Sequence, residues 1–314
     1  MDRRQLILAG VAMAAASGWA SRAARAAIKR VGIQLFSVPK LLSSDFRGTL
    51  QWLASIGYSE IEFYGPYEFS DPKTIASWKA LGPTLGFNGS GFFGKSAAEA
   101  AAILKETRLT APSMHTDLLT LQENMGALAE AAHTIGATYV VLPAIPEEDR
   151  KTLDDYKHMA DVFNRIGEQA KRAGVRFGYH NHGYGLHEMD GQVPLKVLLD
   201  QTDPALVFFE MDIYWTTAGG MNPVRLMKDY PKRYRMLHVK DMKEIKHFSG
   251  DGGTPSQWME LFPYLTSVGD GKLDIKAIVA EGERVGIEHY FVEQEDAPDP
   301  KVSLKRSVDY LKRL

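Results

Sequence analysis

The chain has 314 residues, no cysteine and a net charge of −2. A chain of this length suits one large α/β domain, and the lack of cysteine excludes disulfides, thiolate metal sites and cysteine nucleophiles. The mildly acidic balance, without a run of basic residues, argues against a groove for nucleic acid. Any metal ion must therefore bind to His, Asp or Glu side chains or to water.

The amino terminus has the pattern of an export signal. Paired arginines at residues 3–4 stand just before an apolar run at residues 6–20, and an A-x-A cleavage pattern follows at residues 24–26. The run is too short to span a bilayer, and the paired arginines favour the twin-arginine type of signal. We therefore expect residues 1–26 to be removed, and residues 27–314 to form a periplasmic or secreted protein without a membrane span.

From residue 31 onward, short β-rich runs alternate with helical patterns. The alternation has no hairpin signal, which predicts parallel strands joined by right-handed crossovers. No glycine-rich turn follows the first strand, so a doubly wound sheet is disfavoured, and we predict a single (β/α)8 TIM barrel. The predicted strands cover residues 31–36, 60–63, 111–116, 137–142, 175–180, 206–212, 236–240 and 289–294. The predicted helices cover residues 46–56, 96–107, 125–135, 153–173, 194–201, 222–229, 275–284 and 301–313.

Two connections stand out as irregular. Residues 65–95 are rich in Gly, Pro and aromatic residues, and we expect an elaborated loop with one short helix there. Residues 242–270 are too long for an ordinary barrel connection. This second segment is predicted to be a mobile lid over the site.

Ionisable residues gather at the carboxyl ends of the last four predicted strands, where barrel enzymes carry their active sites. Residues two apart in a strand share a face, and repeated charges inside a barrel are unfavourable unless they are paired or bound to a cation. A divalent ion would relieve several carboxylates at once. Asp241 and Glu295, where loops begin, are expected to be solvated or capping groups. The inward-facing residues are His180, His182, Glu210, Asp212, His238, Lys240 and Glu293.

We expect one divalent metal ion at these strand ends. Asp212, His238 and Glu293 are the strongest predicted ligands, and His180 is the expected fourth, with Glu210 competing for that place. A ligand set of nitrogen and oxygen atoms does not choose among Mn, Mg, Co and Zn.

Other residues are expected to contact the substrate. Gln34, Glu62 and His115 end or follow earlier strands and would reach substrate hydroxyls. Trp215 is predicted to stack on a sugar ring, with packing in the core or rim as the alternative.

The ordered motifs resemble the sugar phosphate isomerase/epimerase family, within the superfamily of xylose isomerase-like barrels. The resemblance implies one metal held by Glu, Asp, His and Glu from the last four strands, and three of these fall on Asp212, His238 and Glu293. Epimerases of the family carry Glu where this chain has His180, and Gly185 stands where relatives with a His-Asn-His motif usually have Glu. The motifs are Gly32-Ile33-Gln34-Leu35-Phe36-Ser37, Tyr179-His180-Asn181-His182, Asp212-Ile213-Tyr214-Trp215, Gly219-Gly220, His238-Val239-Lys240-Asp241 and Val292-Glu293-Gln294.

Residues and resemblance together predict a metal-dependent isomerase or epimerase for a small carbohydrate. Glu293 or Glu210 would remove a proton next to a carbonyl, the metal would stabilise the enediolate, and His182 or Lys240 would return the proton. A nearby metal is expected to lower the pKa of Lys240, which would let this residue act as the base. The oligomeric state stays open, with a homo-oligomer among the options.

Two alternatives remain beside this prediction. Exported relatives imply a lyase, hydratase or hydrolase that cleaves 3-keto-glycosides after an oxidoreductase has made the ketone. The second alternative is a sugar-binding barrel without catalysis.

Overall fold

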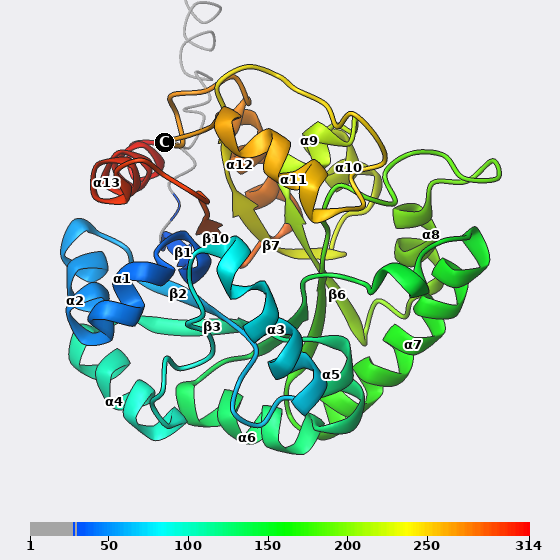
Figure 1. The fold of residues 1–314 in the computed structure, drawn as a ribbon. Coiled ribbons are helices and arrows are strands. Elements are labelled where there is room, and N and C mark those ends of the chain that lie inside the picture. The colour runs from blue at the N-terminus through cyan, green and yellow to red at the C-terminus, as the bar shows by residue number, and fades with distance from the viewer. Residues whose placement is uncertain (1–27, 29) are drawn as a thin grey trace, which may run out of the picture.

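The computed structural model describes residue 28 and residues 30–314, so the predicted export signal lies outside the described residues. The described chain forms a closed parallel barrel in the order β1-β2-β3-β4-β5-β6-β7-β10, with β10 returning to β1 (Figure 1). The predicted (β/α)8 architecture is confirmed. The barrel strands are β1 (Gly32–Gln34), β2 (Glu60–Tyr64), β3 (Thr110–His115), β4 (Tyr139–Leu142), β5 (Arg176–His180), β6 (Val207–Asp212), β7 (Tyr234–Val239) and β10 (His289–Val292).

Helices surround the barrel, as α2, α4, α6 and α7 show along its outer side in Figure 1. Local sequence sets their ends: the Asp45 carboxylate caps the first turn of α2, and Gly57 ends the helix at a φ of 117°, a left-handed conformation that favours glycine. The helices are α1 (Pro39–Ser44), α2 (Phe46–Ile56), α3 (Pro72–Leu85), α4 (Ala97–Thr107), α5 (Leu118–Glu123), α6 (Met125–Ile135), α7 (Leu153–Arg172), α8 (Pro194–Gln201), α9 (Ile213–Ala218), α10 (Pro223–Asp229), α11 (Pro255–Leu261), α12 (Ile275–Val285) and α13 (Pro300–Leu311).

The segment predicted as an elaborated loop with one short helix is more regular than expected. It contains α3, which is 14 residues long. Gly82 and Pro83 lie inside this helix and weaken its sequence pattern, because both residues are poor helix formers. Among the described helices, none combines the length and apolar character needed to cross a bilayer.

An apolar layer closes the barrel beneath the site. Tyr139, Val141, Met236 and Phe291 form a buried cluster inside the barrel. A side chain on Gly32 would place its Cβ 2.5 Å from the Phe291 ring, so glycine leaves room for this ring in the barrel. The rings of Phe291 and His238 are 6.2 Å apart between centroids, so the ionisable residues lie directly on this layer.

The long connection after β7 carries structure of its own. Strands β8 (Asp241–Met242) and β9 (Leu265–Thr266) pair in an antiparallel ribbon, which the sequence did not predict. The Asp241 carboxylate accepts backbone N–H groups from the turn that follows β9, including those of Gly269 and Gly271. The expectation that Asp241 is solvated is therefore wrong: it is buried and organises this turn.

Candidate active site

Strands β2, β3, β5, β6 and β7 and the segment after β10 bring a dense group of ionisable side chains together at the carboxyl-terminal mouth of the barrel. The alternation of the strands aims them inward, as expected. All are buried, and they include the residues predicted as ligands, proton-transfer groups and substrate contacts except Gln34, His182 and Trp215. The group comprises Glu62, His115, His180, Glu210, Asp212, His238, Lys240, Glu293 and Glu295.

Glu210 lies at the centre of a histidine-rich set. Its Oε2 atom is 2.8 Å from His115 Nε2 and 3.1 Å from His180 Nδ1. The same oxygen is 3.3 Å from His238 Nε2. Ligand atoms of these four residues all lie within 4.8 Å of one another, which is close enough to hold one metal ion.

Glu62 faces the same histidines from β2. Its Oε2 atom is 2.7 Å from His238 Nε2 and 3.1 Å from His115 Nε2. Gln34 donates its amide N–H to this oxygen at 2.7 Å. Of the residues predicted as substrate contacts, Glu62 thus interacts directly with the predicted metal ligand His238, while Gln34 and His115 interact with Glu62.

Lys240 lies at the centre of a second set of ionisable side chains. It follows His238 by two residues, so this set is nearer the mouth of the barrel. Its Nζ atom is 2.5 Å from Glu295 Oε1, 2.7 Å from Glu293 Oε2 and 3.1 Å from Asp212 Oδ2. Asp212, His238 and Glu293 also place ligand atoms within 4.8 Å of one another. His238 is therefore shared between this set and the histidine-rich set.

The predicted ligands His180, Asp212, His238 and Glu293 meet, but they do not form one compact set. His180 Nε2 is 3.9 Å from Asp212 Oδ2, while its Nδ1 faces Glu210. The other oxygen of Asp212 accepts the backbone N–H groups of residues 214 and 215 and so caps α9. The ligand assignment made from the sequence stays a prediction.

Several buried carboxylate oxygens lack a hydrogen-bond donor. Burial of such atoms is costly unless a donor or a cation compensates them. Five carboxylates meet one ammonium group in this cluster, so negative charge is in excess unless the histidines are protonated or a cation binds. The donor set and the excess charge thus fit a divalent ion. The oxygens without a donor are Glu62 Oε1, Glu210 Oε1 and Glu295 Oε2, and Asp212 Oδ2 has only its ion pair with Lys240.

The carboxylates shift the pKa values of the nearby cations upward. Burial alone would lower the pKa of His115, but Glu62 and Glu210 raise it to about 9. Burial likewise opposes the charge of Lys240, yet Asp212, Glu293 and Glu295 hold its pKa well above the ordinary value. In the metal-free protein Lys240 is therefore an ammonium ion, and the expectation that a nearby metal lowers its pKa stays a prediction.

His182 is a neutral imidazole in this site. Its Nδ1 atom lies 2.7 Å from the carbonyl oxygen of Pro143, which can only accept, so Nδ1 carries the proton. Burial, assisted by Lys240, lowers the pKa of His182 to about 3. Its Nε2 atom is therefore an acceptor.

A cavity of about 470 Å³ opens onto this cluster. Its volume is within the usual range for small-molecule sites, roughly 300–1,000 Å³. Glu210, Asp212 and Lys240 do not line the cavity, whereas four histidines, Glu293 and Glu295 do. The lining includes Gln34, Phe36, Tyr64, His115, His180, His182, His238, Trp258, Glu293 and Glu295.

Trp215 and Trp258 differ in whether they reach the cavity. Trp215 is only 1% exposed and stacks against Phe248 in a buried cluster, so its predicted contact with a sugar stays a prediction. Trp258, from α11, lines the cavity, and its ring centroid is 4.6 Å from that of His182. The sequence had placed Trp258 only in the expected lid.

Glu295 is the clearest site residue that the sequence analysis missed. It was expected to be solvated or to cap, but it is 8% exposed and bonded to Lys240. Burial raises the pKa of Glu295 to about 7, against the opposite effect of Lys240. Glu295 lies two residues after Glu293, so both side chains point to the same side if the strand alternation continues past the end of the strand. This spacing was the signal that could have identified Glu295.

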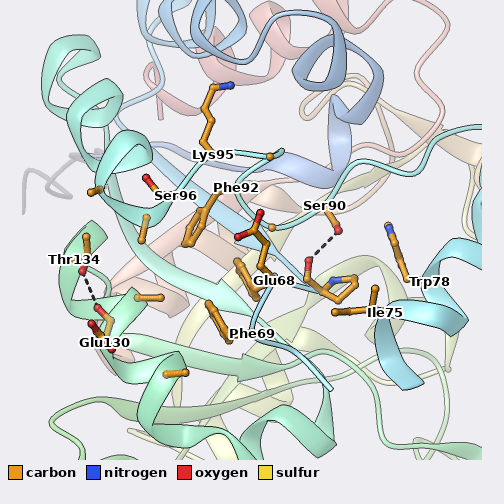
Figure 2. A pocket seen from close by; sticks show the side chains of 18 of the residues that line it. Glu68, Phe69, Ile75, Trp78, Ser90, Phe92, Lys95, Ser96, Glu130 and Thr134 are labelled. Carbon is orange, nitrogen blue, oxygen red and sulfur yellow. Dashed lines mark hydrogen bonds between the residues drawn. The ribbon is translucent and has the colours of Figure 1, made fainter. Parts of the chain in front are cut away.

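A second cavity of about 780 Å³ lies away from this cluster, between α3, α4 and α6. Figure 2 shows Phe69, Trp78 and Phe92 around it, with Glu68 and Lys95 nearby. No histidine is among the described residues that line it. The ionisable cluster therefore opens onto the smaller of the two cavities.

Known proteins with similar sequences have the same barrel fold. The family described as xylose isomerase-like TIM barrel matches residues 50–314. Inosose dehydratase from Clostridium tetani is 27% identical over 168 residues, which cover 52% of this chain and 55% of that protein. The match thus spans about half the length of the curated relatives.

Solved structures give the same fold. A sugar phosphate isomerase/epimerase from Parabacteroides distasonis has a TM-score of 0.72 at 23% identity, covering 90% of this chain and 93% of that chain. The IOLI protein, solved with a bound zinc atom, has a TM-score of 0.61 at 15% identity, covering 90% and 95% of the two chains. At these identities the likeness establishes the fold.

Proposed function

Because the chain belongs to the xylose isomerase-like TIM barrel family, we propose that it is a metal-dependent isomerase or epimerase of a small carbohydrate. The proposal depends on one observation, the convergence of buried carboxylates, histidines and a lysine on a cavity of about 470 Å³. The opening step is removal of a proton from the carbon next to a carbonyl group. This chemistry is consistent with the similar proteins, which include a sugar phosphate isomerase/epimerase.

The ligands for the ion come from the two sets that share His238, with His115, His180 and Glu210 on one side and Asp212 and Glu293 on the other. A divalent ion there would supply Lewis-acid stabilisation of the negative charge that develops on a carbonyl oxygen. Mn, Mg, Co and Zn are all compatible with nitrogen and oxygen ligands.

Glu293 is the residue best suited to accept the proton. It lines the cavity. Burial would raise its pKa, but Lys240 and His238 outweigh burial and keep the pKa below its ordinary value, so the group is ionised. Glu210 lies behind the cavity wall, which suits a ligand better than a base. His182 Nε2 provides a second acceptor on the cavity side.

Lys240 is the proposed proton donor. Its ammonium is 2.7 Å from Glu293 Oε2, so a proton can pass between Lys240 and Glu293 along a single hydrogen bond. Lys240 does not line the cavity itself, so Glu293 or Glu295, which do, would pass its proton to an oxygen or carbon of the substrate. Positioned acid–base groups of this kind contribute roughly 100- to 10,000-fold each.

Dehydration is the second candidate, and the inosose dehydratases among the relatives favour it. It begins with the same proton removal and then requires an acid for the departing hydroxyl group, a role that Lys240 can fill. The substrate would be a keto-sugar or keto-cyclitol. Cleavage of 3-keto-glycosides differs only in the group that leaves.

Solvent exchange separates these reactions. The metal-loaded protein is incubated with keto-sugars, inososes and 3-keto-glycosides in deuterated water and followed by NMR. Deuterium in an intact sugar supports isomerisation or epimerisation, loss of water supports dehydration, and release of an aglycone supports glycoside cleavage. Glu293→Gln is the matched control and should lose all exchange. Sugar binding without exchange in the wild-type protein would contradict an enzymatic function.

A further inference from the structure

We propose that α3 is a lid over the catalytic cavity, that it opens into the second cavity on its other side, and that Trp78 on this lid contacts the bound substrate. The inference rests on the proposed function and deepens it, because it names the part of the fold that admits and encloses the substrate. It also assigns a role to the larger cavity, which provides the space for the movement.

Helix α3 separates the two cavities. Pro66 and Trp78 line both the catalytic cavity of about 470 Å³ and the second cavity of about 780 Å³. Figure 2 shows Ile75 and Trp78 at the edge of the second cavity. The helix therefore has open space on two of its sides. The other residues that α3 contributes are Thr74, Ser77 and Leu81 to the catalytic cavity and Lys79 to the second cavity.

Few contacts hold α3 to the rest of the barrel. Of its 14 residues only Gly82 is buried, whereas α6 buries six of its 11 residues. Within the described chain, a single hydrogen bond joins α3 to a segment outside residues 65–95, from Thr74 Oγ1 to Asp117 Oδ1 at 2.9 Å. Leu81 lines the catalytic cavity but is 48% exposed. Elements with so few buried contacts open locally at a lower free energy than the core.

The segment that carries α3 leaves and rejoins the barrel at one place. The backbone N–H of Gly91 donates to the carbonyl oxygen of Tyr64 at 2.8 Å. Ser90 Oγ donates to the carbonyl oxygen of Pro66 at 2.9 Å, as a dashed line in Figure 2 shows. Gly86 ends α3 with a φ of 73°, a left-handed conformation that favours glycine. Hinges are a few residues at element ends, often small ones, that absorb changes in φ and ψ. This segment therefore moves as one flap about a single base.

The connection over residues 242–270, expected from the sequence to be the lid, is anchored at several points. Arg150 donates an N–H group to the carbonyl oxygen of Gly253 at 2.6 Å. The backbone N–H of Phe248 donates to the carbonyl oxygen of Ala218 at 3.1 Å. The β8–β9 ribbon also joins the two ends of the connection. This connection therefore forms a fixed wall of the cavity, and α3 is the wall that moves.

Trp78 is the residue of the lid placed to contact the substrate. Its ring centroid is 5.9 Å from that of Tyr64, which also lines the catalytic cavity. Its Nε1–H donates to the carbonyl oxygen of Asn88 at 2.9 Å, so the ring is held by the flap itself and moves with it. Closure of such a lid excludes water, which protects an enediolate from side reactions.

The lack of cysteine permits a reversible lock on the lid. Thr74→Cys and Asp117→Cys together place two thiols where the side chains share a hydrogen bond, so that a disulfide holds α3 against the start of α5. In hydrogen-exchange mass spectrometry of the metal-loaded protein, we expect residues 72–85 to exchange at least about 10-fold more slowly in the oxidised than in the reduced form. Thr74→Ser with Asp117→Cys carries one thiol, undergoes the same oxidation and should show no change. A short bismaleimide joins the two thiols if no disulfide forms.

Turnover tests the link between the lid and catalysis. The substrate is whichever keto-sugar, inosose or 3-keto-glycoside reacts in deuterated water. The disulfide should lower kcat/KM by roughly 10-fold or more, and a reductant should restore it. Trp78→Ala should raise KM by roughly 3- to 10-fold, while Lys79→Ala, which borders only the second cavity, should leave KM unchanged.

The outcomes separate the lid from the proposed function. Equal exchange of residues 72–85 in the locked and unlocked forms, or an unchanged kcat/KM in the locked protein, overturns the lid and leaves the catalytic function standing. Slower exchange in the locked protein without turnover of any of the three substrate classes supports a mobile α3 and contradicts the enzymatic function. An unchanged KM in Trp78→Ala overturns the contact of Trp78 with the substrate.

Discussion

Lys240 and Glu293 form an ion pair of 2.7 Å in the mouth of the barrel, where both side chains are almost fully buried. Asp212 and Glu295 complete a ring of carboxylates around the same ammonium. A buried ion pair adds little over a packed apolar pair, but removal of one partner leaves an uncompensated charge. Lys240 thus compensates part of the buried negative charge and stabilises the folded protein.

Replacement of Lys240 should therefore destabilise the protein strongly. We expect Lys240→Met to lower the free energy of unfolding of the metal-free protein by about 3–5 kcal/mol, the usual effect of breaking a buried pair. Urea denaturation at neutral pH measures this change. The matched control is Lys305→Met, which removes a half-exposed lysine paired with Asp309 and should leave stability unchanged within error. Equal effects of the two variants would contradict the role given to Lys240.

Metal uptake should release protons at neutral pH. In the metal-free protein, burial opposes protonation of His115, but Glu62 and Glu210 raise its pKa to about 9, so the ring is protonated at pH 7. A ligand nitrogen must lose this proton before it binds a metal. Zn affinity should therefore fall as the pH decreases below about 9. Calorimetry in two buffers with different ionisation enthalpies measures the protons released. Affinity that is independent of pH in this range would count against His115 as a ligand.

Much of the site follows from strand alternation. The period of two in the sequence places His180, Glu210, His238 and Lys240 inside the barrel, and the structure agrees. The shared role of His238 could not be predicted, because the direction of each ring nitrogen depends on contacts between β7, β2 and the segment after β10. The same limit applies to the ring of carboxylates around Lys240, which raises the pKa of Lys240 in the metal-free protein.

The sequence predicted the long elements of the fold but not the short ones. Helices with clear amphipathic patterns and caps, such as α2 and α6, have the expected bounds. The β8–β9 ribbon and the four short helices α1, α5, α9 and α11 were missed, because two-residue strands and helices of six or seven residues carry too little periodicity to recognise. Tertiary contacts rather than local propensity determine these elements.

The export signal can be tested without knowledge of the activity. We expect a diderm bacterial host to release the protein from its periplasm by osmotic shock, with an amino terminus at residue 27. Arg3→Lys combined with Arg4→Lys should retain the full-length chain in the cytoplasm, since the paired arginines are the predicted recognition feature. Arg22→Lys, outside the pair, is the control and should be exported. An unprocessed amino terminus in all three proteins would refute the signal.

Trp258, rather than Trp215, should contribute to sugar binding. Trp258 lines the cavity beside His182, whereas Trp215 is buried against Phe248. An aromatic contact is worth about 0.5–1.5 kcal/mol beyond its buried area, so Trp258→Ala should raise KM by roughly 3- to 10-fold with little change in kcat. Trp258→Phe keeps a ring at this position and should recover most of the affinity. Steady-state kinetics on the substrate found by solvent exchange provide the measurement. A KM unchanged in Trp258→Ala would place the sugar elsewhere in the cavity.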